Sequence, residues 1–191
     1  MTIGLYFGSF NPIHIGHLII ANHILNETTL QKIWFVVSPQ NPFKPSATLL
    51  NEYDRLHLVQ KAVEQDDRLK AVDIEFNLPK PSYTVETLAY LKEKFPAHTF
   101  HIIMGSDSFQ NLPNWKNANV IAANYPIIVY ERPQFEVRNT LNADIQVMKA
   151  PLLEISATYI RNLIKAGKSI KYLVPQSIEE ELSTNTFYKK L

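Results

Sequence analysis

The stretch from Ile3 to Ala21 most constrains how this chain can fold. It opens with a short apolar run rich in β-forming residues and closes in the apolar run of a helix, so its middle is predicted to be a strand-to-helix loop. A helix N-terminus presents N–H groups without intrahelical partners, and a glycine just before it lets an anion approach the main chain. Because Gly8 and Gly16 flank this loop, the stretch predicts an anion-binding site.

Two histidines stand at the predicted start of that helix. His14 and His17 are three residues apart, so they lie on one helical face and point at whatever the loop holds. A solvated surface pair and one half of a metal site are the alternatives. The metal reading has little support, because the chain has no cysteine and no His-Glu-x-x-His motif. The spacing therefore indicates that both imidazoles contact the same phosphate group, and we assign no metal ligands.

Length and composition limit the class of protein. The chain has 191 residues, 46% of them hydrophobic, which suits one domain spanning 1–191. A net charge of +1 without a basic run disfavours binding to a nucleic-acid polymer. The chain starts without a basic targeting region and has no apolar run of membrane-spanning length, so we expect a cytoplasmic protein that does not engage a membrane. The sequence is also compatible with a homo-oligomer.

Apolar runs of strand length alternate with helical patterns along the chain. After the first strand, strands are expected at Lys32–Ser38, Leu69–Ile74, Thr99–Met104, Tyr125–Tyr130 and Ile145–Met148, and helices at Glu52–Gln65, Val85–Phe95 and Gln176–Thr184. Nearly continuous apolar strands are typical of a parallel sheet covered on both faces. We predict an α/β fold: a Rossmann-like, doubly wound parallel sheet of order 3-2-1-4-5 plus an added strand, with helices on both faces. Asn51 is the predicted N-cap of the helix from Glu52, which leaves Arg55 and His57 free to face solvent.

Ligands of such sheets bind outside the carboxyl ends of the strands, where the strand order reverses. Here the reversal falls between the first and the fourth strand, so Gly8 and Gly105 are expected to face each other across one crevice. Gly105 would leave room for a base or ribose, and Asp107 could accept hydrogen bonds from sugar hydroxyls. An aspartate that caps the following helix is an equal alternative, and both can hold at once.

Two further helix starts are anion-receptive. Ser156 is the predicted N-cap of one helix, and Arg161 on it could hold a phosphate in fork geometry. Residues 82–84, Ser-Tyr-Thr, lead from a proline-marked loop into another helix. Taken alone, both segments read as ordinary caps.

Three segments together resemble a known family. The run from Gly8 to His17 is similar to the H-x-G-H signature of the nucleotidyltransferases, and Gly105–Asp107 and Ile155–Arg161 match the same family in the same order. The resemblance spans most of the chain and is closest to the nicotinate or nicotinamide mononucleotide adenylyltransferases. It implies transfer of the adenylyl group of ATP to a pyridine mononucleotide.

The resemblance also implies a site. Its catalytic residues would be His14, His17, Lys44 and Arg161. Its ATP-binding residues would be Gly8, Ser9, Phe10, Gly16, Gly105, Asp107, Ile155, Ser156 and Thr158. Its mononucleotide-binding residues would be Asn11, Ser82, Tyr83, Thr84 and Trp115, with Trp115 stacked on the pyridine ring and residues 82–84 at its carboxylate. Residues 151–191 would form a helical segment that completes the ATP site, and Mg²⁺ would arrive with ATP.

The acceptor has several alternatives. The segment from Gly8 to Asn11 also looks like that of the eukaryotic enzymes that accept the amide, whereas Ser82-Tyr83-Thr84 resembles the bacterial acid-specific enzymes. We therefore expect nicotinate mononucleotide first and nicotinamide mononucleotide second. Phosphopantetheine adenylyltransferase, which shares the Gly-Ser-Phe opening, is a third reading. A non-catalytic nucleotide-binding regulator is the fourth, although its mark, loss of His17 or Arg161, is absent here.

Overall fold

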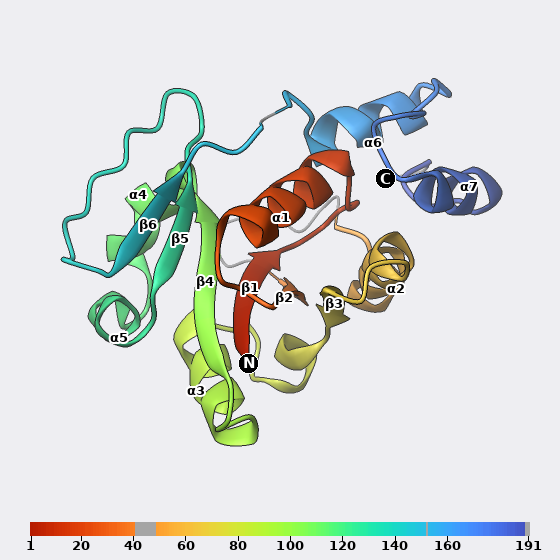
Figure 1. Cartoon of the computed structure of the whole chain (residues 1–191). Helices are drawn as coiled ribbons and strands as arrows, with labels where there is room; N and C mark the ends of the chain where they lie inside the picture. Colours follow the sequence, from red (N-terminus) through yellow and green to blue (C-terminus); the bar gives the residue numbers. More distant parts are fainter. Residues whose placement is uncertain (41–48, 152, 190–191) are drawn as a thin grey trace.

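Six parallel strands form the central sheet. The computed structural model of the protein describes residues 1–40, 49–151 and 153–189. The strand order is β3-β2-β1-β4-β5-β6, so the predicted order is confirmed and the added strand extends the β5 edge (Figure 1). The strands are β1 (Thr2–Gly8), β2 (Lys32–Val37), β3 (Leu69–Val72), β4 (Thr99–Gly105), β5 (Ile127–Tyr130) and β6 (Ile145–Met148).

Helices connect the strands and close the chain. They are α1 (Ile15–Glu27), α2 (Glu52–Val63), α3 (Thr84–Lys94), α4 (Ser106–Asn111), α5 (Ala118–Asn124), α6 (Ala157–Lys165) and α7 (Gln176–Thr184), with 3₁₀ turns η1 (Ile74–Asn77) and η2 (Leu112–Asn114). Two predicted caps are confirmed: Asn51 accepts a hydrogen bond from the N–H of Tyr53, and Ser156 accepts one from the N–H of Tyr159.

The sheet is covered on both faces by two separate cores. Alternate strand side chains face opposite ways, so neighbours in β1 such as Leu5 and Tyr6 belong to different cores. The core around Tyr6 is completed by residues of α1, α2, α6 and α7, and the core around Leu5 by residues of α3, α4 and α5. The strands are therefore apolar on both sides, as the sequence indicated.

Local details differ from the expectations. The third strand ends at Val72, two residues early, because the chain turns into η1. Helix α5 was not predicted; its seven residues are too few to show a helical period. Asp107 is not an N-cap, because Gly105 occupies that position of α4 and Asp107 lies in the first turn.

Among the residues that the structure describes, no helix is both long enough and apolar enough to cross a membrane.

Candidate active site

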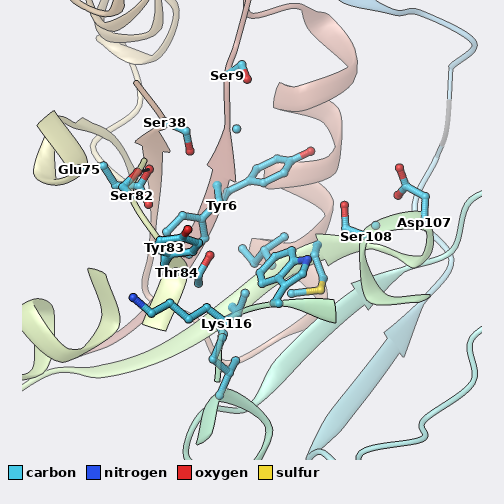
Figure 2. A pocket seen from close by; sticks show the side chains of 18 of the residues that line it. Tyr6, Ser9, Ser38, Glu75, Ser82, Tyr83, Thr84, Asp107, Ser108 and Lys116 are labelled. Atoms are coloured by element: carbon cyan, nitrogen blue, oxygen red, sulfur yellow. Dashed lines mark hydrogen bonds between the residues drawn. The ribbon is translucent and has the colours of Figure 1, made fainter. Parts of the chain in front are cut away.

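A cavity opens where the strand order reverses. The end of β1 contributes Gly8 and the following Ser9, and the end of β4 contributes Gly105 and the nearby Asp107, so the predicted crevice between Gly8 and Gly105 is present. Figure 2 shows Ser9 and Asp107 at this cavity. A Cβ at Gly105 would collide with the Asp107 carboxylate and lie 2.8 Å from Nε of Arg132, so glycine lets these two side chains keep their places. The carboxyl ends of β1 and β4 thus bring polar groups to one cavity, as is common in parallel α/β sheets.

The other end of the cavity is built by the start of α3. Ser82, Tyr83 and Thr84 line it together with Trp115 and Lys116. Tyr83 is the N-cap, and its carbonyl accepts hydrogen bonds from the N–H groups of residues 86 and 87, so the N–H groups of residues 84 and 85 precede the first intrahelical donor. Such a pocket suits a flat ring that carries an anionic substituent.

Lys116 adds a cation that the sequence analysis did not single out. Its Nζ lies 4.4 Å from the centre of the Tyr83 ring and 2.6 Å from a carboxylate oxygen of Glu86. An ammonium over an aromatic face is stabilised by the ring quadrupole. The pyridine end predicted from residues 82–84 and Trp115 therefore also carries an ammonium group, paired with the carboxylate of Glu86.

A buried carboxyl group fastens this end of the cavity. Glu75 of η1 is 3% exposed and accepts hydrogen bonds from Oγ of Ser82 at 3.0 Å and from Oγ1 of Thr87 at 2.9 Å. Burial raises the pKa of Glu75, although the hydrogen bonds from Thr87, Ser38 and Ser82 oppose this. Glu75 thus ties η1 and the loop at Ser82 to α3.

The two histidines meet at the start of α1. The backbone N–H of His14 donates to Nδ1 of His17 at 3.2 Å, and the two rings stack with their centres 3.8 Å apart. A Cβ at Gly16 would lie 3.1 Å from Nδ1 of His14, so glycine leaves room for this stack. The predicted pairing of the imidazoles is present.

His14 is held as a neutral imidazole. Its side chain is buried, and within the described part of the chain its Nδ1 has no hydrogen-bond partner. Burial, with a smaller contribution from the charge of Arg132, lowers the pKa of His14 to about 4.

Arg132 is a site cation that the sequence analysis missed. Its Nε lies 3.3 Å from Oδ1 of Asp107, its Nη2 donates to the hydroxyl of Tyr130 at 3.2 Å, and its backbone N–H donates to Oγ of Ser106. Arg132 follows β5 directly, at the same carboxyl edge as the other site loops. That position was the available signal, because polar residues after parallel strands gather at one edge.

The start of α6 reaches the loop after β1. Nη1 of Arg161 donates to the carbonyl of Asn11 at 2.7 Å, and its Nη2 donates to Oγ1 of Thr158 at 3.1 Å. Ile155 is half-buried beside the exposed cap Ser156. The segment predicted to hold the outer ATP phosphates is therefore brought to the loop.

The cavity lining includes part of the predicted site: Gly8, Ser9, residues 82–84, Gly105, Asp107 and Trp115. The other described residues of the prediction are not among the lining residues: His14, Gly16, His17, Ile155, Ser156, Thr158 and Arg161. The last three predicted residues stand apart. The ring of Phe10 is buried, packs on Tyr6 and Phe35, and lies against Gly8, so only its backbone could meet a ligand. Asn11 is buried and is not among the residues that line the cavity. Lys44 lies outside the described residues.

The expectation that Arg55 faces solvent is wrong. Arg55 is fully buried and donates to four backbone carbonyls: those of Ser9 and Ser38 at 2.7 Å, and of Leu50 and Pro39 at 2.8 Å. Buried backbone carbonyls where two loops meet need hydrogen-bond donors, and the planar guanidinium of one arginine supplies several donors in a fixed geometry. Arg55 thus links the loop after β1 to the loop after β2.

Metal ligands do not gather in the described residues. Among residues 1–40, 49–151 and 153–189, no group of three or more His, Cys, Asp or Glu side chains could hold a metal ion. Asp107 lines the cavity, but its Oδ1 faces Arg132.

Comparison with known proteins identifies the family. The family model described as cytidylyltransferase-like matches residues 5–163. A "probable nicotinate-nucleotide adenylyltransferase" of Cytophaga hutchinsonii is 50% identical over 98% of each chain, and one of Flavobacterium johnsoniae is 50% identical over the full length of both. The solved structure of Plasmodium falciparum nicotinic acid mononucleotide adenylyltransferase complexed with NaAD is 20% identical, superposes with a TM-score of 0.82, and covers 98% of this chain and 97% of its own, which shows the shared fold. The chain belongs to the cytidylyltransferase-like family and, within it, to the nicotinate-nucleotide adenylyltransferases.

Proposed function

We propose that this protein transfers the adenylyl group of ATP to nicotinate mononucleotide, giving deamido-NAD and pyrophosphate in NAD biosynthesis. The observation that carries the proposal is the shared cavity: the anion-binding loop at Gly8 and Ser9 and the ring pocket at Tyr83 and Trp115 open into one hollow. A pyridine mononucleotide lying between them would point its phosphate at a nucleotide held by the loop. The full-length relatives at 50% identity support the same reaction.

The chemistry needs alignment rather than a general base. The attacking 5′-phosphate is already ionised at neutral pH, so catalysis consists of holding two anions in line and neutralising the charge that moves to the leaving pyrophosphate. His14 and His17 would donate hydrogen bonds to the ATP phosphates. Arg161 and Lys44 would hold the leaving end, and Arg132 adds a third cation beside the same cavity.

Selection of the acid over the amide would arise at the start of α3. A nicotinate carboxylate would accept hydrogen bonds from the N–H groups of residues 84 and 85 and meet the positive end of the helix. Lys116, although paired with Glu86, would add a short-range attraction for the carboxylate that a carboxamide does not feel. Both features support nicotinate mononucleotide as the acceptor.

Magnesium would enter with the nucleotide. Mg²⁺ prefers oxygen ligands and keeps few protein contacts when it rides on polyphosphates. This suits a cavity whose two lining carboxyl groups already have partners: Asp107 is paired with Arg132, and Glu75 accepts hydrogen bonds from Ser82 and Thr87. When bound, the ion would neutralise charge on the phosphates of ATP.

An acceptor panel tests the proposal. The protein is incubated with ATP, Mg²⁺ and one of nicotinate mononucleotide, nicotinamide mononucleotide or phosphopantetheine, and pyrophosphate is measured. We expect the highest kcat/KM with nicotinate mononucleotide. Preference for another acceptor would reassign the substrate, and no pyrophosphate with any acceptor would favour a nucleotide-binding regulator.

A further inference from the structure

The C-terminal residues contact the loop after β1. Beyond α7, the hydroxyl of Tyr188 donates to Oδ1 of Asn11 at 2.8 Å, and the Tyr188 side chain is 1% exposed. The two residues are 177 positions apart in the chain. The end of the chain is therefore hydrogen-bonded to the loop after β1.

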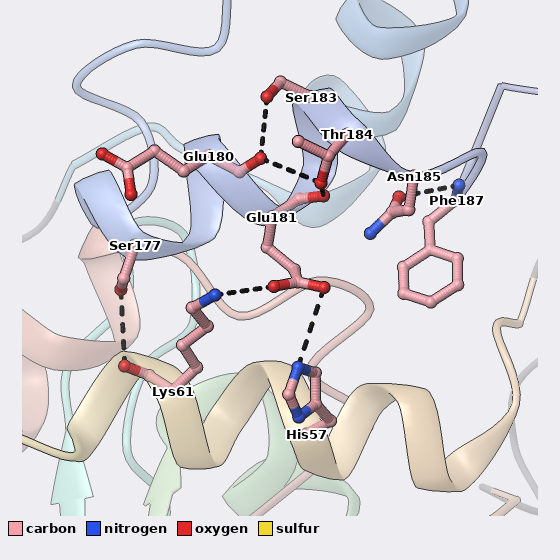
Figure 3. A network of polar contacts seen from close by, with 9 residues as sticks. All are labelled: His57, Lys61, Ser177, Glu180, Glu181, Ser183, Thr184, Asn185 and Phe187. Carbon is pink, nitrogen blue, oxygen red and sulfur yellow. Dashed lines mark hydrogen bonds and ion pairs between the residues drawn. The ribbon is translucent and has the colours of Figure 1, made fainter.

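Helix α7 is fastened so that it delivers Tyr188 to this place. It lies along α2, where Glu181 pairs with Lys61 at 2.6 Å and with Nε2 of His57 at 3.7 Å, and Ser177 donates to the carbonyl of Lys61 (Figure 3). After α7 the chain turns sharply, and Tyr188 takes a φ of 62°. A bulky residue in this left-handed region is energetically unfavourable. Burial of the ring and the hydrogen bond to Asn11 offset that cost.

Asn11 is the link between Tyr188 and Arg161. Its Oδ1 also accepts a hydrogen bond from the N–H of Leu50 at 3.1 Å, while its backbone carbonyl accepts the bond from Nη1 of Arg161 at 2.7 Å. Two donors on one carboxamide oxygen fix the side chain, and the fixed residue sets where its carbonyl points. The Arg161 guanidinium is thus oriented by a residue whose own position depends on Tyr188.

We propose that Tyr188 is a positioning residue of the adenylyl transfer: through Asn11 it places Arg161 against the ATP phosphates. The inference rests on the proposed function, because it gives Arg161 the role of phosphate ligand. Burial raises the pKa of Tyr188, so its hydroxyl keeps the proton that it donates. The C-terminal turn is accordingly part of the ATP site and more than a peripheral support.

The substitution Tyr188→Phe removes only the hydroxyl and keeps the buried ring. We expect it to raise KM for ATP roughly three- to tenfold, the effect of one lost buried hydrogen bond, and to leave KM for nicotinate mononucleotide within about twofold. Tyr172→Phe is the matched control, because Tyr172 lies on the same C-terminal segment with 81% of its surface exposed. Thermal unfolding of each variant is recorded, and kinetics are measured well below every unfolding midpoint. A lower unfolding midpoint is expected in either case, because a buried hydrogen bond is lost. A merely structural role would change both KM values alike or neither of them.

A double-mutant cycle with Arg161→Lys tests the route of the effect. If Tyr188 acts through Arg161, Tyr188→Phe should change KM for ATP by less than about twofold once Arg161 is replaced. Equal KM shifts for both substrates, a full effect in the Arg161→Lys background, or no difference from Tyr172→Phe would each overturn the inference. The proposed function fails separately, if the unaltered protein releases no pyrophosphate with nicotinate mononucleotide.

Discussion

The backbone N–H of His14 donates to Nδ1 of His17, and this bond decides which nitrogen of His17 can face a ligand. With Nδ1 used as an acceptor, a neutral His17 carries its proton on Nε2. The stacked ring of His14 is buried beside it. The pair thus offers hydrogen-bond donors and acceptors to a polyphosphate without needing two buried positive charges in the free protein.

His14 should titrate far below the usual range of a histidine. In the ligand-free protein, NMR of the imidazole should give a midpoint near the pKa of about 4, and assignment by His14→Gln should remove that signal. Because the unfolded chain takes up this proton near pH 6.5 and the folded chain does not, stability should fall as the pH drops from about 6.5 towards 4. Binding of an ATP analogue should raise the midpoint, since a phosphate favours the charged imidazole. A midpoint near 6.5 in the free protein would contradict the burial argument.

Replacing the buried carboxyl group should change how stability depends on pH. The raised pKa of Glu75 means that its contribution to folding is greatest below the unfolded pKa of 4.5 and is lost as the pH rises through the folded value. Relative to the unaltered protein, Glu75→Gln should therefore gain free energy of unfolding as the pH rises from 4 to 8, because glutamine never ionises. Chemical denaturation at several pH values measures this trend. Glu136→Gln, at a side chain 72% exposed, is the control and should show no comparable trend; a flat difference for Glu75→Gln would refute the prediction.

The arginine at the loop crossing should tolerate no replacement by lysine. A lysine ammonium cannot reach the four carbonyls that Arg55 serves, so Arg55→Lys should lower the free energy of unfolding by about 2–4 kcal/mol, from carbonyls left unsatisfied. Arg68→Lys, at an exposed pair with Asp66, should change it by less than about 1 kcal/mol. Urea denaturation compares the two. Equal small losses would mean that Arg55 does not join the two loops.

Local sequence signals predicted the elements, and distant contacts built the rest of the site. Asn51 and Ser156 were predictable as caps because each cap bonds a residue two or three positions away. The burial of Arg55 was not, since its acceptors at Ser9 and Pro39 come from other loops. Tyr188 had no local signal at all, because its partner lies 177 positions earlier.

The family signature indicated the residues of the first loop but not how each side chain is placed. Phe10 is a core residue, and the side-chain oxygen of Asn11 accepts a hydrogen bond from Tyr188 near the end of the chain. Arg132 lies outside the signature and became visible only when β5 was placed beside β4.

The cation at the pyridine end should set the preference for an acid. Lys116→Met keeps the length of the side chain and removes the charge, so the ratio of kcat/KM for nicotinate over nicotinamide mononucleotide should fall roughly three- to tenfold, with KM for ATP unchanged. Lys171→Met is the control, since Lys171 lies over the exposed Tyr172 in a similar cation–π contact. Pyrophosphate release with both acceptors gives the ratio. An unchanged ratio would leave selection to the helix N–H groups alone.

The most direct test of the whole account is turnover by His17→Ala. The assay follows pyrophosphate from ATP and nicotinate mononucleotide, with circular dichroism and thermal unfolding as checks of the fold. Loss of a donor aimed at the reacting phosphates should lower kcat by about 10²-fold or more while the unfolding midpoint stays close to that of the unaltered protein. A folded His17→Ala protein with near-normal kcat would contradict the assignment of this loop as the catalytic centre.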